Sequence, residues 1–124
     1  MKYESEHEAQ KGVFEFCREL MKTYPALKML YAIPNGFRSN PEAAKWMKDE
    51  GLKPGVPDLC LPVARGGFHG LYIEMKRKGG KKPTDDQCEW LHSLGREGYA
   101  AYCCMGREAA QDTILKYVRG DILR

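Results

Sequence analysis

The segment Leu71-Tyr72-Ile73-Glu74-Met75-Lys76 decides the predicted fold. It is also unusual, because it places two charged residues on a predicted core strand. Side chains two positions apart point to the same face of a strand, so Glu74 and Lys76 share one face. The apolar residues at positions 71, 73 and 75 occupy the opposite face. Placing a carboxylate and an ammonium group on a core strand is costly unless they pair or bind a metal ion. We therefore expect a functional site on this strand.

A second segment, Gly55-Val56-Pro57-Asp58-Leu59, is typical of a turn that leads into an apolar strand. Asp58 begins that strand, which is predicted over residues 58–62. The connection to the Glu74 strand is short and rich in glycine, which favours an antiparallel hairpin. Asp58 and Glu74 then lie on neighbouring strands, where their carboxylates can converge.

Composition indicates a globular chain of 124 residues, which we expect to form a single domain over residues 1–124. The N-terminal residues contain no apolar signal segment, so we expect the protein to stay in the cytoplasm. The net charge of +3 supports no global electrostatic conclusion. The five cysteines form an odd set without a C-x-x-C pair, which argues against a disulfide framework and a zinc site.

Hydrophobic periodicity along the chain predicts the fold class α/β, with elements in the order αβαββαβα. The predicted helices cover about residues 6–22, 42–50 and 107–119, with a further helix that begins after Thr84 and ends at Gly95 or Gly98. Two further strands are predicted over residues 27–33 and 99–105. The turn Pro34-Asn35-Gly36 ends the first of these strands, and Ser39 or Asn40 is expected to cap the second helix. Trp46 and Met47 are expected to dock that helix.

Two helices begin with the spacing of a capping box, Ser5 with Glu8 and Thr84 with Gln87. Capping is a sufficient structural role for Glu8. Glu6 has no such role, although it stands at the polar start of the stripe that faces the core.

Carboxylates on neighbouring strands suit a hard divalent cation, because Mg²⁺ and Mn²⁺ prefer oxygen ligands and keep bound waters. Such an ion polarises a phosphoryl oxygen and lowers the pKa of bound water. Asp58 and Glu74 are the expected ligands, and Lys76 would orient the water or neutralise developing charge. Gln87 would hold a water or a phosphate oxygen, and Glu6 would add a third carboxylate.

Each of these residues also has a purely structural interpretation. Asp58 is a common turn residue, and Gln87 is explained by its capping box. Glu74 and Lys76 could form a pair on an exposed sheet face, which contributes about 0–1 kcal/mol. The three histidines show no ligand spacing and are expected to face solvent or form local hydrogen bonds.

Pro57-Asp58 followed by Glu74-Met75-Lys76 resembles the PD-(D/E)xK nuclease superfamily, and more narrowly the virus-type replication-repair nuclease (VRR-NUC) domain. The resemblance implies a restriction-endonuclease-like core, with a mixed central sheet flanked by helices. The matching elements are Ser5-Glu6…Gln10, Asn35-Gly36, Gly55-Val56-Pro57-Asp58-Leu59, Glu74-Met75-Lys76, Gln87…Trp90 and Gly98-Tyr99.

The resemblance also implies roles for individual residues. The implied ligands of Mg²⁺ or Mn²⁺ are Asp58, Glu74 and the Met75 main-chain carbonyl, with Glu6 as a further ligand. Lys76 is implied as the catalytic lysine and Gln87 as the active-site glutamine. Glu6 is implied as the acidic residue of the first helix, and Glu8 is the alternative for that position.

The implied activity is a metal-dependent DNA endonuclease of the stand-alone phage type, acting in DNA repair within the host cytoplasm. Relatives of that type resemble Holliday-junction resolvases and work as dimers. A dimer would double the phosphate contacts and present two sites about a two-fold axis, as a four-way junction does. Two alternatives remain: a non-catalytic nucleic-acid-binding module of the same fold, and a nuclease acting on RNA or linear DNA ends.

Exposed cations are the expected contacts to DNA phosphates, setting affinity and its salt dependence rather than sequence preference. The densest cluster is residues 76–82, directly after the Glu74 strand. The candidates are Arg38, Lys45, Lys48, Lys53, Arg65, Arg77, Lys78, Lys81 and Lys82.

Overall fold

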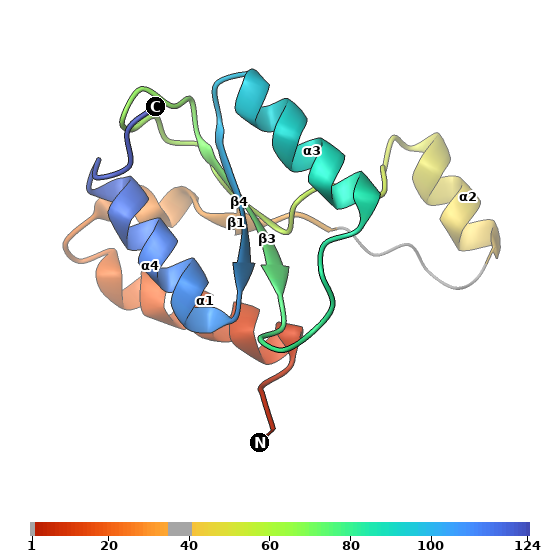
Figure 1. The fold of residues 1–124 in the computed structure, drawn as a ribbon, viewed down its shortest axis with the longest axis horizontal. Helices are drawn as coiled ribbons and strands as arrows, with labels where there is room; N and C mark the ends of the chain where they lie inside the picture. Colours follow the sequence, from red (N-terminus) through yellow and green to blue (C-terminus); the bar gives the residue numbers. More distant parts are fainter. Residues whose placement is uncertain (1, 35–40) are drawn as a thin grey trace.

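A four-stranded sheet with the order β1-β2-β3-β4 lies at the centre of the computed structural model (Figure 1). The structure describes residues 2–34 and 41–124. The first two pairings are antiparallel and the third, between β3 and β4, is parallel. The predicted α/β class with a mixed sheet is therefore confirmed. The strands are β1 (Tyr31–Ala32), β2 (Leu59–Leu61), β3 (Leu71–Lys76) and β4 (Ala100–Met105).

Four α-helices follow the predicted order in the described ranges, and none is long and apolar enough to cross a membrane. They are α1 (Glu6–Leu20), α2 (Pro41–Asp49), α3 (Asp85–Arg96) and α4 (Arg107–Val118). The strand predicted over residues 27–33 is wrong in its first part, where a 3₁₀-helix, η1 (Pro25–Met29), stands instead. Proline at its first position favours this turn, and Leu27 anchors it because its side chain is buried in the core.

The hydrophobic core lies between the sheet and the helices α1 and α4, which pack on the same side of it (Figure 1). Both helices contribute small and medium apolar residues, among them Val13 and Ile114. Tyr117 is fully buried, and its hydroxyl donates a hydrogen bond of 2.6 Å to the Val63 carbonyl. The apolar face predicted for β3 belongs to this core, since Leu71, Ile73 and Met75 are each at most 1% exposed.

Helix α3 lies on the other side of the sheet, away from α1 and α4 (Figure 1). None of its residues is fully buried. One of its anchors is Trp90, whose indole Nε1 donates to the Pro54 carbonyl at 3.1 Å. Helix α3 covers the face of β3 that carries Glu74, and Gln87 near its start contacts that side chain.

Helix α2 projects away from the rest of the chain (Figure 1). It contains no buried residue, and Trp46 is 70% exposed. The prediction that Trp46 docks the helix is therefore wrong, because the amphipathic pattern is present but its apolar side does not reach the core. Met47 is partly buried. The predicted turn at Asn35-Gly36 and the cap at Ser39 or Asn40 lie outside the described residues.

Candidate active site

Asp58 is held in place from three directions. Its main-chain carbonyl accepts a hydrogen bond of 2.7 Å from Ile33, and its Oδ2 accepts one of 2.8 Å from the Met75 main-chain N–H. The turn before it rests on the start of α3 at Gly55, where φ is +89°. A Cβ atom at Gly55 would lie 2.7 Å from the Asp86 main-chain carbon, so only glycine fits there. The Asp58 carboxylate thus has a defined position at the start of β2.

Glu74 is buried on β3 with a side chain 2% exposed, opposite Cys103 of β4. Its Oε2 accepts a hydrogen bond of 3.1 Å from Gln87 Nε2 and lies 3.9 Å from Lys76 Nζ. Its Oε1 is buried and, when Glu74 is ionised, has no hydrogen-bond donor among the described residues. A proton on Glu74 would be shared with Asp58, and this hydrogen bond contributes to the raised pKa of Glu74. A buried carboxylate oxygen without a partner carries a free-energy cost, which a bound cation would remove.

Gln87 joins the start of α3 to this carboxylate. Its main-chain N–H donates to Thr84 Oγ1 at 3.2 Å, and its Oε1 accepts from the Thr84 main-chain N–H at 2.8 Å. The capping box predicted here is therefore confirmed. Because Oε1 is engaged by the cap, Nε2 is directed at Glu74. Gln87 therefore completes the cap and contacts Glu74 at the same time. Its predicted contact with a water or a phosphate oxygen stays a prediction.

The pKa of Glu74 rises from 4.5 to about 8. Burial is the largest cause, and the neighbouring Asp58 carboxylate is the next; Lys76 opposes the rise and Glu6 adds to it. Ionising Glu74 beside Asp58 is unfavourable because it places two like charges in a poorly solvated site. A divalent cation between them would reverse this balance.

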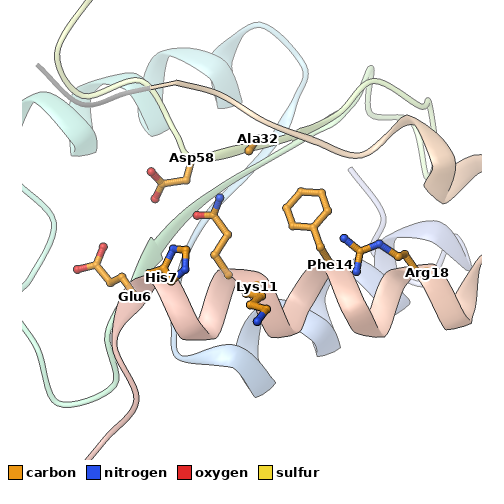
Figure 2. Close-up of a pocket in the computed structure, with 8 residues that line it drawn as sticks. Glu6, His7, Lys11, Phe14, Arg18, Ala32 and Asp58 are labelled. Carbon is orange, nitrogen blue, oxygen red and sulfur yellow. The ribbon is translucent and has the colours of Figure 1, made fainter.

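Glu6, and not Glu8, faces Asp58. Glu8 is engaged in the α1 capping box, where its Oε1 accepts hydrogen bonds from Ser5 Oγ at 3.0 Å and Ser5 N at 3.4 Å. Figure 2 shows the Glu6 and Asp58 carboxylates directed into the same space between α1 and the sheet. Of the two acidic residues proposed for the first helix, Glu6 has the geometry for a role in the site.

The donor set fits a hard cation that keeps several waters. No group of three or more His, Cys, Asp or Glu side chains in the described ranges is close enough to hold a metal ion by itself. Asp58 and Glu74 supply two carboxylates, and Met75 offers only main-chain atoms because its side chain is in the core. Mg²⁺ is commonly bound in this way, by one or two carboxylates with waters and substrate phosphates completing the shell.

Most of the predicted phosphate contacts are exposed. The loop after β3 carries four of them next to Lys76, and Lys78 Nζ lies 5.8 Å from the centre of the Tyr3 ring. The exposed candidates are Lys45, Lys48, Lys53, Arg77, Lys78, Lys81 and Lys82. Arg38 lies outside the described residues. Arg65 instead serves the fold, since its guanidinium donates to the Val118 carbonyl at 3.2 Å and the Ala64 carbonyl at 2.8 Å.

One face of α1 extends the site in a way that the sequence interpretation missed. His7, Lys11, Phe14 and Arg18 line the same groove as Glu6 and Asp58. Their spacing of four, three and four residues places them on one helical face, which is the signal that could have revealed them. The sequence interpretation followed a neighbouring stripe of the helix that leads to the core.

Comparisons with known proteins agree with this geometry. A family model for the VRR-NUC domain matches residues 31–108, more than half of the chain. The fold is also similar to a solved structure described as a "VRR_NUC domain protein", with a TM-score of 0.75 and 29% sequence identity over 95% of this chain and 91% of the other. None of the curated proteins matches significantly. The fold and site define a nuclease-type α/β domain. The chain belongs to the VRR-NUC family.

Proposed function

We propose that this protein is a metal-dependent endonuclease that hydrolyses phosphodiester bonds in branched DNA. The observation that supports this most directly is the buried Glu74 carboxylate. It is 2% exposed, has one oxygen without a partner among the described residues, and lies beside a second carboxylate, Asp58. Such an arrangement destabilises the metal-free fold, so its presence is best explained by a cation that it binds.

In this proposal Asp58, Glu74 and the Met75 carbonyl hold Mg²⁺ or Mn²⁺, and Glu6 contributes through a water bound to the ion. The ion, when bound, would polarise the phosphoryl oxygen and provide a water of lowered pKa. Lys76, 12% exposed and 3.9 Å from Glu74 Oε2, is near enough to neutralise charge that develops on the phosphate. Gln87 acts as a positioning residue because its amide is shared between Thr84 and Glu74.

The proposed substrate class is supported by the family resemblance and by the exposed cations of this domain. A homodimer would present two sites related by a two-fold axis. The cations of residues 77–82 lie beside the Lys76 end of β3, where they would contact phosphates flanking the cut.

Cleavage of a labelled panel of substrates tests this function: a four-way junction, a flap, a linear duplex and an RNA duplex. We expect cleavage of the branched DNA only with Mg²⁺ or Mn²⁺, and its loss in Asp58→Ala with binding retained. Equal cleavage by Asp58→Ala would contradict the site. Binding without any cleavage by the wild type would favour a non-catalytic module, and a preference for linear ends or RNA would favour the other alternative.

A further inference from the structure

A groove of about 420 Å³ leads away from the proposed metal site along one face of α1 (Figure 2). Glu6 and Asp58 stand at one end, and Phe14 and Arg18 lie further along the helix (Figure 2). Its lining includes the acidic Glu6 and Asp58 and the basic Lys11 and Arg18, with Phe14 between the two basic residues along the helix. The groove is thus acidic where the metal would bind and becomes basic and aromatic with distance from it.

The basic side chains in this groove have no partner within the described part of the chain. Neither Lys11 nor Arg18 forms an ion pair or a side-chain hydrogen bond with a described residue, and both are exposed. By contrast, the exposed Lys22, near the end of α1, pairs with Glu19 at 2.7 Å. Two unpaired cations along one groove favour an anionic occupant.

Phe14 adds a surface on which a base can stack. Its ring is partly buried against the core and points into the groove (Figure 2). Stacking of a nucleic-acid base on an aromatic side chain contributes about 1–3 kcal/mol and tolerates any sequence. A positively charged groove that also offers an aromatic stacking surface is a combination by which single-stranded nucleic acid is commonly bound.

The dimensions of the groove suit a single nucleic-acid strand. Phe14 is eight residues from Glu6 along α1, which corresponds to about 12 Å at a rise of about 1.5 Å per residue. A volume of about 420 Å³ is in the range of sites for small organic ligands. A groove of this volume accommodates a nucleotide unit.

We propose that this groove binds the unpaired strand that adjoins the scissile phosphate, with a base on Phe14 and phosphates at Lys11 and Arg18. The preferred substrate is then DNA with a single-stranded arm, or a branch point whose strands are unstacked beside the cut. This inference rests on the proposed nuclease function, since that function places the cut at Asp58 and Glu74.

Fluorescence anisotropy tests the groove without cleavage, using Glu74→Gln as the background in the presence of EDTA. The two probes are a labelled duplex with a single-stranded arm and a blunt duplex of the same length. Phe14→Leu is expected to weaken binding of the armed probe about fivefold to tenfold, in line with lost stacking. Lys11→Gln with Arg18→Gln should weaken it about tenfold and reduce the salt slope of the binding constant by about 1.4.

Three controls make the result interpretable. Lys22→Gln removes an exposed cation near the end of α1 that does not line the groove. It should change the affinity for the armed probe and for the blunt probe by no more than about twofold. Phe14→Tyr keeps the ring and should bind as the background protein does. Thermal melting confirms that each variant is folded.

Unchanged affinity of the groove variants for the armed probe would overturn the inference. An equal loss for both probes would also overturn it, because that result indicates general electrostatic attraction. The groove inference and the proposed function can fail independently. The groove inference fails if the variants bind the armed probe normally without metal. The proposed function fails if the wild type does not cleave DNA or if Asp58→Ala remains active.

Discussion

Helices α1 and α3 begin with the same local motif, and the motif has different consequences at the two places. In α1 the third residue, Glu8, uses its carboxylate only to complete the cap with Ser5. In α3 the equivalent residue, Gln87, completes the cap with Thr84 and also donates to the buried Glu74. A capping box therefore does not exclude a role in a site. At α3 the cap fixes one end of the amide and so directs the other end.

The largest expected effect concerns Glu74, whose carboxylate accepts a hydrogen bond from the α3 capping residue Gln87. The α1 capping residue Glu8 makes no such contact. Glu74→Gln keeps the shape of the side chain and removes its charge. We expect metal-dependent cleavage to fall by about a thousandfold or more, the scale on which a main electrostatic contribution to a transition state is lost. Steady-state cleavage of a labelled branched substrate measures this, and activity within tenfold of wild type would contradict the role of Glu74.

Exchanging the residue types of the two caps sharpens the comparison. Gln87→Glu preserves a capping side chain but places a carboxylate against Glu74, whereas Glu8→Gln preserves the α1 cap and changes nothing at the site. We expect Gln87→Glu to lower cleavage about 10- to 100-fold, as removal of an outer-shell partner does. Glu8→Gln should change neither cleavage nor melting beyond about 0.5 kcal/mol. Similar losses of cleavage in Gln87→Glu and Glu8→Gln would show that the two capping residues do not differ in their importance for the site.

The metal-free protein should lose stability as the pH rises from 4.5 to 8. The folded state holds a proton on Glu74 up to a pKa of about 8, while the unfolded state releases it near 4.5. The stabilising contribution of that proton is therefore complete below pH 4.5 and is lost as the pH rises through 8. Its slope approaches about 1.4 kcal/mol per pH unit at most.

Urea unfolding in EDTA between pH 5 and pH 8.5 measures this dependence. Glu74→Gln cannot ionise at this position, so its profile should be flatter, and it should be more stable than wild type at pH 8. Parallel profiles for the two proteins would show that Glu74 titrates normally in the folded state.

The smallest effect separates the two caps themselves. Ser5→Ala and Thr84→Ala each remove a capping hydroxyl and should lower the free energy of unfolding by about 1 kcal/mol. Only Thr84→Ala should also reduce cleavage, by a few-fold, because the Gln87 main-chain N–H loses its acceptor and the first turn that carries Gln87 is less firmly held. The hydrogen bond from the residue 84 main-chain N–H to Gln87 Oε1 remains. Kinetics at a temperature where both variants are fully folded would reveal this. An equal loss of cleavage in Ser5→Ala would assign the effect to stability alone.

Local signals predicted much of the fold correctly. Both capping boxes and the hairpin of β2 and β3 depend on near neighbours or on simple periodicity, and the structure contains them. The replacement of the predicted strand start by η1 depends on Pro25 and on the burial of Leu27, which is tertiary information. The exposure of Trp46 has the same origin, since periodicity reports an apolar face but not whether another element covers it.

The sequence predicted which side chains belong to the candidate site. The structure adds their hydrogen bonds, the distances between them and their burial. Asp58, Glu74, Lys76 and Gln87 meet on one side of β3, and their chemical roles remain proposals. The unpartnered oxygen of Glu74 depends on packing from three elements and could not be read from the sequence. The use of Arg65 within the fold likewise depends on the distant end of α4.

The central claim is that the buried carboxylate pair is destabilising alone and is stabilised by a divalent cation. Thermal melting of wild type and Glu74→Gln at pH 8, with and without Mn²⁺, tests it most directly. We predict that Glu74→Gln melts at a higher temperature than wild type in EDTA. We also predict that Mn²⁺ at a hundredfold excess over its Kd stabilises only the wild type, by about 2.7 kcal/mol. Equal Mn²⁺ stabilisation of both proteins, or no stabilisation of wild type, would contradict the account.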